Sequence, residues 1–259
     1  MFSEHFAFRP HALVNFVGGG GKTALIHRLM KEYCSRGPVL CTTTTRIHPP
    51  DPREGVSVIS SDQVTLLKRV MERIGRTCSD SSYKIVVTRH FMSPNLLRGV
   101  PPDFANGLDR GLFPILLNEG DGAAGYSLKL PGAGEPVLME NADYLVPVIG
   151  IDCLSRCLGP DVLFRWQAFA EKFSLRAGEC ITPELAAGIL MHPQGVCKDW
   201  KPGVEILPFI NKVDSPAQDS AAEELANALL RNGNFPVERV VFGSVLQGRA
   251  FSVIASWNR

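Results

Sequence analysis

The sequence contains no apolar run long enough to cross a membrane. Its longest apolar stretches are broken by proline, as in residues 144–151, and none approaches the roughly 18 residues that a transmembrane helix needs. The N-terminal segment also lacks the basic region, apolar core and small-residue cleavage site of a secretory signal. From these absences we expect a cytoplasmic protein that has no membrane partner.

The chain also lacks an excess of charge of either sign. Lys and Arg number 27 against 26 Asp and Glu, a formal net charge of +1, which excludes a strongly basic nucleic-acid binder and predicts no nucleic-acid partner. Seven cysteines, an odd number scattered along the chain, predict reduced thiols and no disulfide framework. Cys153 and Cys157 are closely spaced, but without a second pair or a histidine cluster we interpret them as two half-buried thiols on one helical face.

Short apolar runs alternate with amphipathic segments of helical length, as in a parallel sheet covered by helices. Strands are predicted at residues 13–17, 39–42, 56–59, 84–88, 113–118, 144–149, 206–210 and 240–242. Helices are predicted at residues 22–35, 62–76, 102–109, 160–173, 183–191 and 217–231. The pattern predicts an α/β fold of three layers, with a mostly parallel sheet and helices on both of its faces.

We expect residues 1–259 to form a single domain, in which residues 150–204 are a small helical insertion or subdomain. Residues 93–102 and 122–136 interrupt the alternation and are predicted to be long ordered loops, where sites often lie.

A glycine loop joins the first predicted strand to the first predicted helix. The strand is followed by four glycines, a lysine and a threonine, which are Gly18, Gly19, Gly20, Gly21, Lys22 and Thr23. Each glycine costs about 0.5–1 kcal/mol relative to alanine in regular structure, so four in a row indicate a turn with unusual dihedral angles. Amides at a helix N-terminus bind anions, Lys22 adds a charge, and Thr23 adds a hydroxyl ligand for magnesium. The loop predicts a site for a nucleotide polyphosphate.

The same loop is compatible with other patterns. Phe16 stands where the long Walker A pattern has its first glycine, and the shorter G-x-x-G-K-T that remains resembles the loop of Mur-type ATP-dependent ligases. A purely structural turn is an alternative. Gly18 and Gly20 also begin the Rossmann pattern G-x-G-x-x-G, although Thr23 replaces the third glycine and no ribose-binding carboxylate follows the second strand. In that alternative Arg46 would meet the 2′-phosphate of NADP.

Two carboxylates, Glu119 and Asp121, follow the apolar strand predicted at residues 113–118. A nucleotide-hydrolysing site places carboxylates beside the phosphates, so we expect Asp121 to hold magnesium with Thr23 while Glu119 positions the attacking water. The alternative is that both residues cap a glycine-rich turn.

Four threonines, residues 42–45, follow the second predicted strand, and Arg46 comes next. Hydroxyls at a strand end, that of Thr43 among them, would reach a metal ion or a γ-phosphate. Arg46 is a candidate for stabilising negative charge during catalysis. A β-branched strand edge without a ligand is the alternative interpretation.

A possible base-reading motif follows the strand at residues 206–210. Asn211, Lys212 and Asp214 form Asn-Lys-x-Asp, in which the carboxylate accepts hydrogen bonds from guanine and the lysine stem packs on the purine. Ser244 ends the next strand, where guanine-binding folds place a second base-contacting loop. A solvated turn is the alternative, and the metal motif D-x-x-G of G proteins is missing because Gly122 is followed by two alanines.

Taken together, these motifs resemble the YqeC-like family, whose usual strings are close to VGGGGKT, TTTTK, EADGA, PLKxP, EP and NKxD. They match residues 18–23, 42–46, 119–123, 127–131, 135–136 and 211–214 in order. The chain departs from the pattern at Gly120, Arg46 and Ser127, none of which removes a charged ligand. The family is described as accessory proteins of selenium-dependent molybdenum hydroxylases.

The resemblance implies a P-loop NTPase-like fold and a role in maturing or loading a molybdenum enzyme or its cofactor. It also draws attention to Lys129 and Glu135 as a second charged pair. Our leading hypothesis is a magnesium-dependent nucleoside triphosphatase that uses ATP or GTP. The alternative is a non-hydrolysing carrier of a nucleotide-bearing cofactor of the molybdopterin dinucleotide type. The sequence leaves the oligomeric state open.

Overall fold

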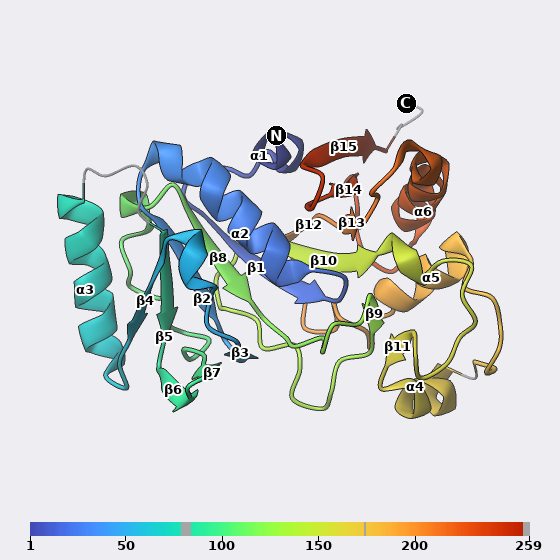
Figure 1. Ribbon diagram of the computed structural model, residues 1–259, viewed down its shortest axis with the longest axis horizontal. Coiled ribbons are helices and arrows are strands. Elements are labelled where there is room, and N and C mark those ends of the chain that lie inside the picture. The colour runs from blue at the N-terminus through green and yellow to red at the C-terminus, as the bar shows by residue number, and fades with distance from the viewer. Residues whose placement is uncertain (79–83, 174, 256–259) are drawn as a thin grey trace.

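The computed structural model describes residues 1–78, 84–173 and 175–255 (Figure 1). Its main sheet comprises β1 (Ala12–Gly18), β2 (Val39–Thr43), β4 (Val56–Ser60), β5 (Lys84–Thr88), β8 (Ile115–Glu119), β10 (Tyr144–Gly150), β12 (Glu205–Ile206), β13 (Phe209–Asn211), β14 (Arg239–Ser244) and β15 (Arg249–Ile254). The spatial order is β15-β14-β13-β10-β1-β8-β2-β5-β4, and β12 also pairs with β10. Neighbouring strands are parallel except β14 and β15, so the predicted α/β fold with a mostly parallel sheet is confirmed.

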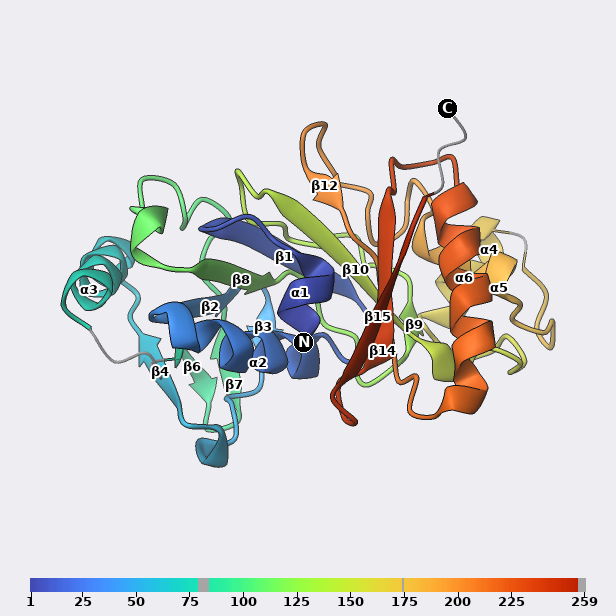
Figure 2. The same ribbon diagram turned by 90° about the horizontal axis from the view of Figure 1, so that it is seen from above.

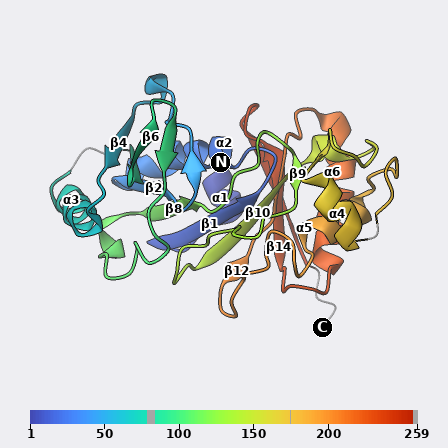
Figure 3. The same ribbon diagram turned by 90° about the horizontal axis from the view of Figure 1, so that it is seen from below.

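Helices cover both faces of this sheet. They are α1 (Phe2–Phe6), α2 (Lys22–Tyr33), α3 (Val64–Thr77), α4 (Trp166–Phe173), α5 (Pro183–Leu190) and α6 (Asp219–Arg231). In β1, Val14 and Phe16 join a buried cluster with α1 and α2, whereas Leu13 and Val17 join clusters on the opposite face with α3 or with α5 and α6. Figure 2 shows the sheet between these layers, and Figure 3 shows α3 and α6 at its two ends.

Each of the eight predicted strands coincides with a strand of the sheet. The prediction at residues 206–210 corresponds to β12 and β13, which keep one register against β10. Pro208 lies between them and has no N–H for the ladder, which explains the interruption. The edge strand β15 and five short strands were not predicted: β3 (Arg46–Ile47), β6 (His90–Ser93), β7 (Leu96–Arg98), β9 (Leu128–Lys129) and β11 (Leu163–Phe164).

Two helix predictions need correction. Residues 102–109 form successive turns, in which Phe104, Ala105 and Leu108 are buried, so their spacing reflects packing and not a helix. In the prediction at residues 160–173, the helix begins only at Trp166, because Leu163 and Phe164 pair with β9. The five-residue α1 is too short for a periodic pattern and was not predicted.

Residues 150–204 contain α4, α5, β11 and long turns, and therefore are less helical than expected. Their apolar side chains share one buried cluster with β10, β13 and α6. Cys153 is buried whereas Cys157 is exposed and forms a backbone bridge with Cys180, so the expectation of two thiols on one helical face is wrong. The described residues contain no disulfide. None of their helices is both long and apolar enough to cross a bilayer.

The packing predicts a large effect at Phe209. Its side chain is fully buried, and its ring centroid lies 5.8 Å from that of Phe2 and 5.6 Å from that of Phe6. We expect Phe209→Ala to lower the free energy of unfolding by about 3–5 kcal/mol, measured by urea denaturation. Phe91→Ala is the control, because 51% of that side chain is exposed, and it should change stability by less than about 0.5 kcal/mol. Equal losses in the two variants would contradict this account of the core.

Candidate functional site

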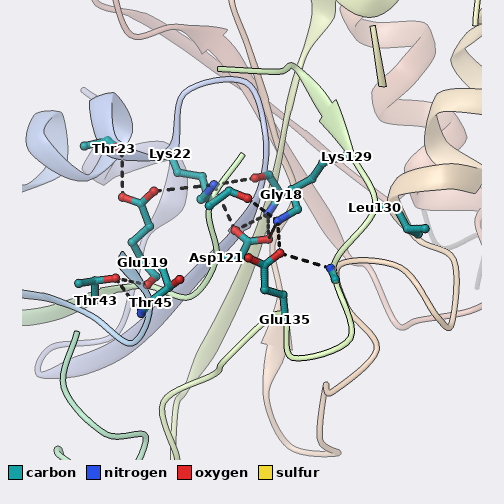
Figure 4. Close-up of polar contacts among 12 residues, drawn as sticks. Gly18, Lys22, Thr23, Thr43, Thr45, Glu119, Asp121, Lys129, Leu130 and Glu135 are labelled. Atoms are coloured by element: carbon teal, nitrogen blue, oxygen red, sulfur yellow. Dashed lines mark hydrogen bonds and ion pairs between the residues drawn. The ribbon is translucent and has the colours of Figure 1, made fainter. Parts of the chain in front are cut away.

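The candidate site lies at the carboxyl end of β1, in the middle of the sheet. There β1 runs into the glycine loop, and α2 begins at Lys22. Phe16 pairs with Glu119 of β8 on one side, and Gly18 pairs with Val148 of β10 on the other. Carboxyl ends of parallel strands are where open α/β sheets bind their ligands, and Figure 4 shows the polar groups that meet at this point.

Glycine is required in the loop for steric reasons. Gly18, Gly20 and Gly21 have φ values of 94°, 79° and 113°, which side chains rarely tolerate. A Cβ atom at Gly18 would lie 2.4 Å from the carbonyl oxygen of Val148, and one at Gly20 would lie 2.2 Å from the amide nitrogen of Gly150. The backbone of the loop therefore contacts the backbone of β10 so closely that no side chain fits at Gly18 or Gly20.

Three of the four glycine amides donate to protein atoms, which departs from the expectation that all would face an anion. Gly18 donates to the Asp121 carboxylate at 3.1 Å, Gly19 to Val148 O at 2.9 Å and Gly20 to Tyr126 O at 2.8 Å. The amides that remain for an external anion are those from Gly21 onward, because the first turn of a helix lacks internal acceptors. That turn carries no acidic residue.

Lys22 is folded back into the loop and only 3% exposed. Its Nζ donates to Gly18 O at 2.6 Å and lies 3.1 Å from Oδ1 of Asp121 and 3.8 Å from Oε1 of Glu119. Asp121 is completely buried, and its Oδ2 lies 2.8 Å from Nζ of Lys129, whose side chain is also completely buried. Both Asp121 oxygens are thus engaged by two lysines and the Gly18 amide. In this structure Asp121 is the buried counter-ion of Lys22 and Lys129, and its predicted role as a magnesium ligand stays a prediction.

The charge network extends from Lys129 to Glu135. The Oε2 atom of Glu135 lies 3.0 Å from Nζ of Lys129 and 2.7 Å from Nη1 of Arg165. Burial alone would raise the pKa of Glu135, but the hydrogen bond from Arg165 and the charge of Lys129 outweigh it and hold that pKa at about 2. Five charges of alternating sign therefore run from Lys22 to Arg165.

Glu119 faces Thr23 across the mouth of the loop. The hydroxyl of Thr23 donates to Oε2 of Glu119 at 2.9 Å, and Glu119 is 7% exposed. Burial raises the pKa of Glu119, although the charge of Lys22 and the hydrogen bond from Thr23 act in the opposite direction. A carboxylate and a hydroxyl thus lie side by side at the mouth of the loop, and oxygen atoms of these two kinds are able to coordinate a hard cation.

The threonines after β2 serve a different purpose from the one expected. The hydroxyls of Thr42, Thr43 and Thr44 donate to the backbone oxygens of Val87, Glu119 and Val137, respectively. Thr43 is completely buried, and its Oγ1 also accepts the amide of Thr45 at 3.1 Å. Thr43 therefore binds the ends of β2 and β8 together and presents no hydroxyl to a metal ion.

The predicted base-reading residues meet at the ends of β13 and β14. Nδ2 of Asn211 donates to Gly20 O at 2.8 Å, and its Oδ1 accepts the amide of Val245 at 3.1 Å, so Asn211 connects this region to the glycine loop. The exposed Asp214 accepts a 2.5 Å hydrogen bond from Ser244.

Lys212, with φ of 65°, turns away from that pair. Its Nζ donates to Ser127 at 2.6 Å and to Asp152 at 2.9 Å. It lines a cavity of about 250 Å³ together with Tyr126 and Arg156.

A larger cavity of about 650 Å³ opens directly on the glycine loop, and Lys22, Thr23, Glu119 and Arg46 line it. The ring of His27 contacts the Glu54 carboxylate on its wall, and burial lowers the pKa of His27 even though Glu54 acts to raise it. In the described ranges there is no cluster of three His, Cys, Asp or Glu side chains that would hold a metal ion without a ligand.

The sequence model of the family described as YqeC protein matches residues 14–167. The chain belongs to the YqeC family. One relative, uncharacterized protein YqeC of Escherichia coli (strain K12), is 26% identical over 246 residues, which are 94% of this chain and 91% of the relative. No solved structure matches the chain. The matched segment includes the glycine loop, the threonines, both carboxylates and the pair of Lys129 and Glu135.

Several residues of the site were not predicted from general motifs. Lys129 and Glu135 were singled out only through the family resemblance, and Arg165 was not singled out at all. Asn15 of β1 and Asn118 of β8 are buried and joined by a 2.7 Å hydrogen bond. Asparagine inside an otherwise apolar strand is a signal that could have identified both, because a buried amide requires partners.

Glu135 supports an acid-dependent stability prediction. Its pKa of about 2 lies below the ordinary value of 4.5, so its contribution is complete above pH 4.5 and is lost as the pH falls towards 2. We expect Glu135→Gln to lower the free energy of unfolding at pH 6 by about 1–2 kcal/mol, because partial solvent exposure weakens the pairing. Near pH 2 the variant and wild type should converge, as measured by urea denaturation.

The matched control is Glu223→Gln, which removes an exposed carboxylate from α6. It should leave stability unchanged at both pH values. A Glu135→Gln deficit that persists unchanged at low pH would show that packing, and not the charge of Glu135, stabilises this region.

Proposed function

We propose that this protein is a magnesium-dependent nucleoside triphosphatase that binds ATP or GTP in the 650 Å³ cavity at the glycine loop. The observation that carries the proposal is the placement of buried Lys22 beside Glu119 and Thr23 at the first turn of α2. A positive charge, unpaired helix amides and a carboxylate–hydroxyl pair are the groups that hold a polyphosphate and its metal ion.

Each group has a defined task in this proposal. The amides from Gly21 onward and the side chain of Lys22 would bind the phosphates. To do so, Nζ of Lys22 would release its hydrogen bond to Gly18 O and donate to a phosphate oxygen. Thr23 and Glu119 would hold Mg²⁺, which supplies charge neutralisation at the phosphates when bound. Arg46, on the wall of the same cavity, would stabilise negative charge as the terminal phosphate is released.

The base would be contacted at the ends of β13 and β14. Asn211 supports this region by bonding to Gly20. Asp214 and Ser244, which bond to each other, would face the base edge. A guanine would be selected if Asp214 accepts its N1 and N2 hydrogens, and comparison of GTP with ATP tests that assignment. By family resemblance, the client of the reaction would be a molybdenum hydroxylase in the course of maturation.

A non-hydrolysing carrier of a nucleotide-bearing cofactor is the second candidate. It is favoured by the observation that both carboxylates are engaged within the protein, Asp121 by two lysines and Glu119 by Thr23. Such a carrier would bind the nucleotide in the same cavity without turnover.

The binding test is thermal unfolding with ATP, GTP, CTP or NADPH, each with and without Mg²⁺. A nucleotide at about 100 times its Kd adds about 2.7 kcal/mol, which raises the Tm by roughly 5–10 °C for a chain of this size. Lys22→Ala should abolish the shift, and Thr23→Ala should abolish only its magnesium-dependent part. Lys31→Ala, on the exposed last turn of α2, is the control and should respond like wild type. A shift with NADPH alone would contradict the triphosphate assignment.

The hydrolysis test uses Glu119→Gln, which keeps the shape of the side chain and removes its charge. We expect phosphate release to fall at least about 100-fold while the magnesium-free part of nucleotide binding remains, because a carboxylate that positions water or metal acts mainly on the chemical step. Release is measured in single-turnover experiments. A wild-type protein that binds a triphosphate but never hydrolyses it would favour the carrier.

A further inference from the structure

A third cavity, of about 430 Å³, lies beside the candidate site, and three arginines, Arg46, Arg89 and Arg98, are among the residues that line it. The short strands β3, β7 and β6 form it, and Figure 1 shows them below the ends of β2 and β5. No role assigned above to the nucleotide uses Arg89 or Arg98. This group of three residues is called the arginine cluster below.

The arginine cluster is held together by backbone pairing that forces like charges together. Arg46 and Arg98 are directly opposite each other in the antiparallel pair of β3 and β7, so their side chains leave the same face of the small sheet. The amide of Arg89 donates to the backbone oxygen of Arg98 at 2.8 Å. Like charges placed directly opposite each other are unfavourable unless a counter-charge is present.

The protein supplies less counter-charge than the cluster carries. The Oδ1 atom of Asp62 lies 3.5 Å from Nη2 of Arg89. The same oxygen accepts a 2.7 Å hydrogen bond from Nδ1 of His90. The side chains of Arg46 and Arg98 form no ion pair with a carboxylate in residues 1–78, 84–173 and 175–255. The side chain of Arg89 is 34% exposed, but its Nε atom is buried and has no hydrogen-bond partner there. Within ion-pair distance, the three guanidinium groups therefore have one carboxylate among the described residues, two negative charges fewer than their positive charges.

The position of the cluster is fixed relative to the nucleotide cavity. Gly99 follows β7, and its amide donates to Thr45 O at 2.7 Å, while Val100 donates to Thr43 O at 2.8 Å. A Cβ atom at Gly99 would lie 2.3 Å from Thr43 O, so the two segments are in close contact. Arg46 lines both cavities, and a ligand in one would therefore be separated from a ligand in the other by this side chain.

We propose that the arginine cluster binds the phosphate group of a second small-molecule ligand, a phosphomonoester, next to the nucleotide. The forked donors of arginine match two oxygens of a phosphate, and a phosphate dianion supplies the two missing negative charges. A single carboxylate would supply only one. The placement of this ligand next to a nucleotide rests on the proposed function. The anion site itself is independent of that function.

The test is isothermal titration of wild-type protein at low ionic strength with inorganic phosphate, glycerol 2-phosphate and succinate. We expect the two phosphates to bind and succinate, a dicarboxylate of similar charge, to bind at least about tenfold more weakly because its charges are spread over two groups. Arg98→Gln should weaken phosphate binding by about tenfold or more, and Arg98→Lys should weaken it by a few fold, because lysine keeps the charge but loses the fork.

Two controls separate this site from general basicity and from the glycine loop. Arg73→Gln removes an exposed arginine from α3 and should bind phosphate like wild type. Lys22→Ala should also retain phosphate binding, even if the protein binds no nucleotide at all. Because the side chain of Arg98 is exposed and has no ion pair in the described chain, Arg98→Gln should keep its Tm within about 2 °C of wild type.

Three results would overturn the proposal. One is phosphate binding that is lost in Lys22→Ala and kept in Arg98→Gln, which would place the anion at the glycine loop. Another is the absence of phosphate binding, or equal binding to Arg98→Gln and Arg73→Gln. The third is succinate that binds as tightly as glycerol 2-phosphate, which would identify the site as one for carboxylates.

Discussion

The buried carboxylate of Asp121 holds the glycine loop in its conformation. It accepts the amide of Gly18 and neutralises Lys22 and Lys129, neither of which has appreciable contact with solvent. Without it, Lys22 would keep only Glu119, at 3.8 Å, and Lys129 would keep only Glu135, at 3.0 Å. Breaking a buried ion pair typically costs about 3–5 kcal/mol. The start of the loop is therefore organised around an anion that the protein itself provides. Only its later part, from Gly21, is directed to the outside.

The charges beyond Lys129 hold together a segment that the sequence predicts to be a long ordered loop. Residues 122–136 are rich in glycine and proline, yet Lys129 bonds to Gly122 O at 2.5 Å and Glu135 joins it to Arg165. Tyr126 also fixes this segment, because its carbonyl accepts the amide of Gly20. The loop that closes one side of the nucleotide cavity thus shares its ion pairs with the glycine loop. A change in the partners of Lys22 alters the field at Asp121 and acts on both loops together.

The strands were predictable because a parallel sheet buries both faces and leaves short apolar runs with clear ends. The glycine loop was predictable because its six residues are contiguous. The partners of Asp121 were not predictable from general motifs. Lys22 reaches it because β1 and β8 pair side by side, and Lys129 reaches it from β9, after the loop that follows β8 has turned back. The position of Thr43 was also not predictable. We expected its hydroxyl to be accessible at the end of β2, but the end of β8 lies beside it, and the hydroxyl donates to the backbone oxygen of Glu119. The small sheet of β3, β6 and β7 lacks periodicity because each of its strands has four residues or fewer.

The number of groups that can act on a ligand is small, because most polar side chains at the strand ends are already bonded to the protein. Thr42, Thr43 and Thr44 donate to backbone oxygens, and Asn211 uses both ends of its amide. These hydrogen bonds make the strand ends rigid, because moving any of the bonded groups would leave a buried donor or acceptor without a partner. The groups that remain accessible to a ligand are the first turn of α2, which includes the exposed Thr23, and the exposed side chain of Arg46. Arg46 lines two cavities, so an anion bound in either one would lie beside the same guanidinium group.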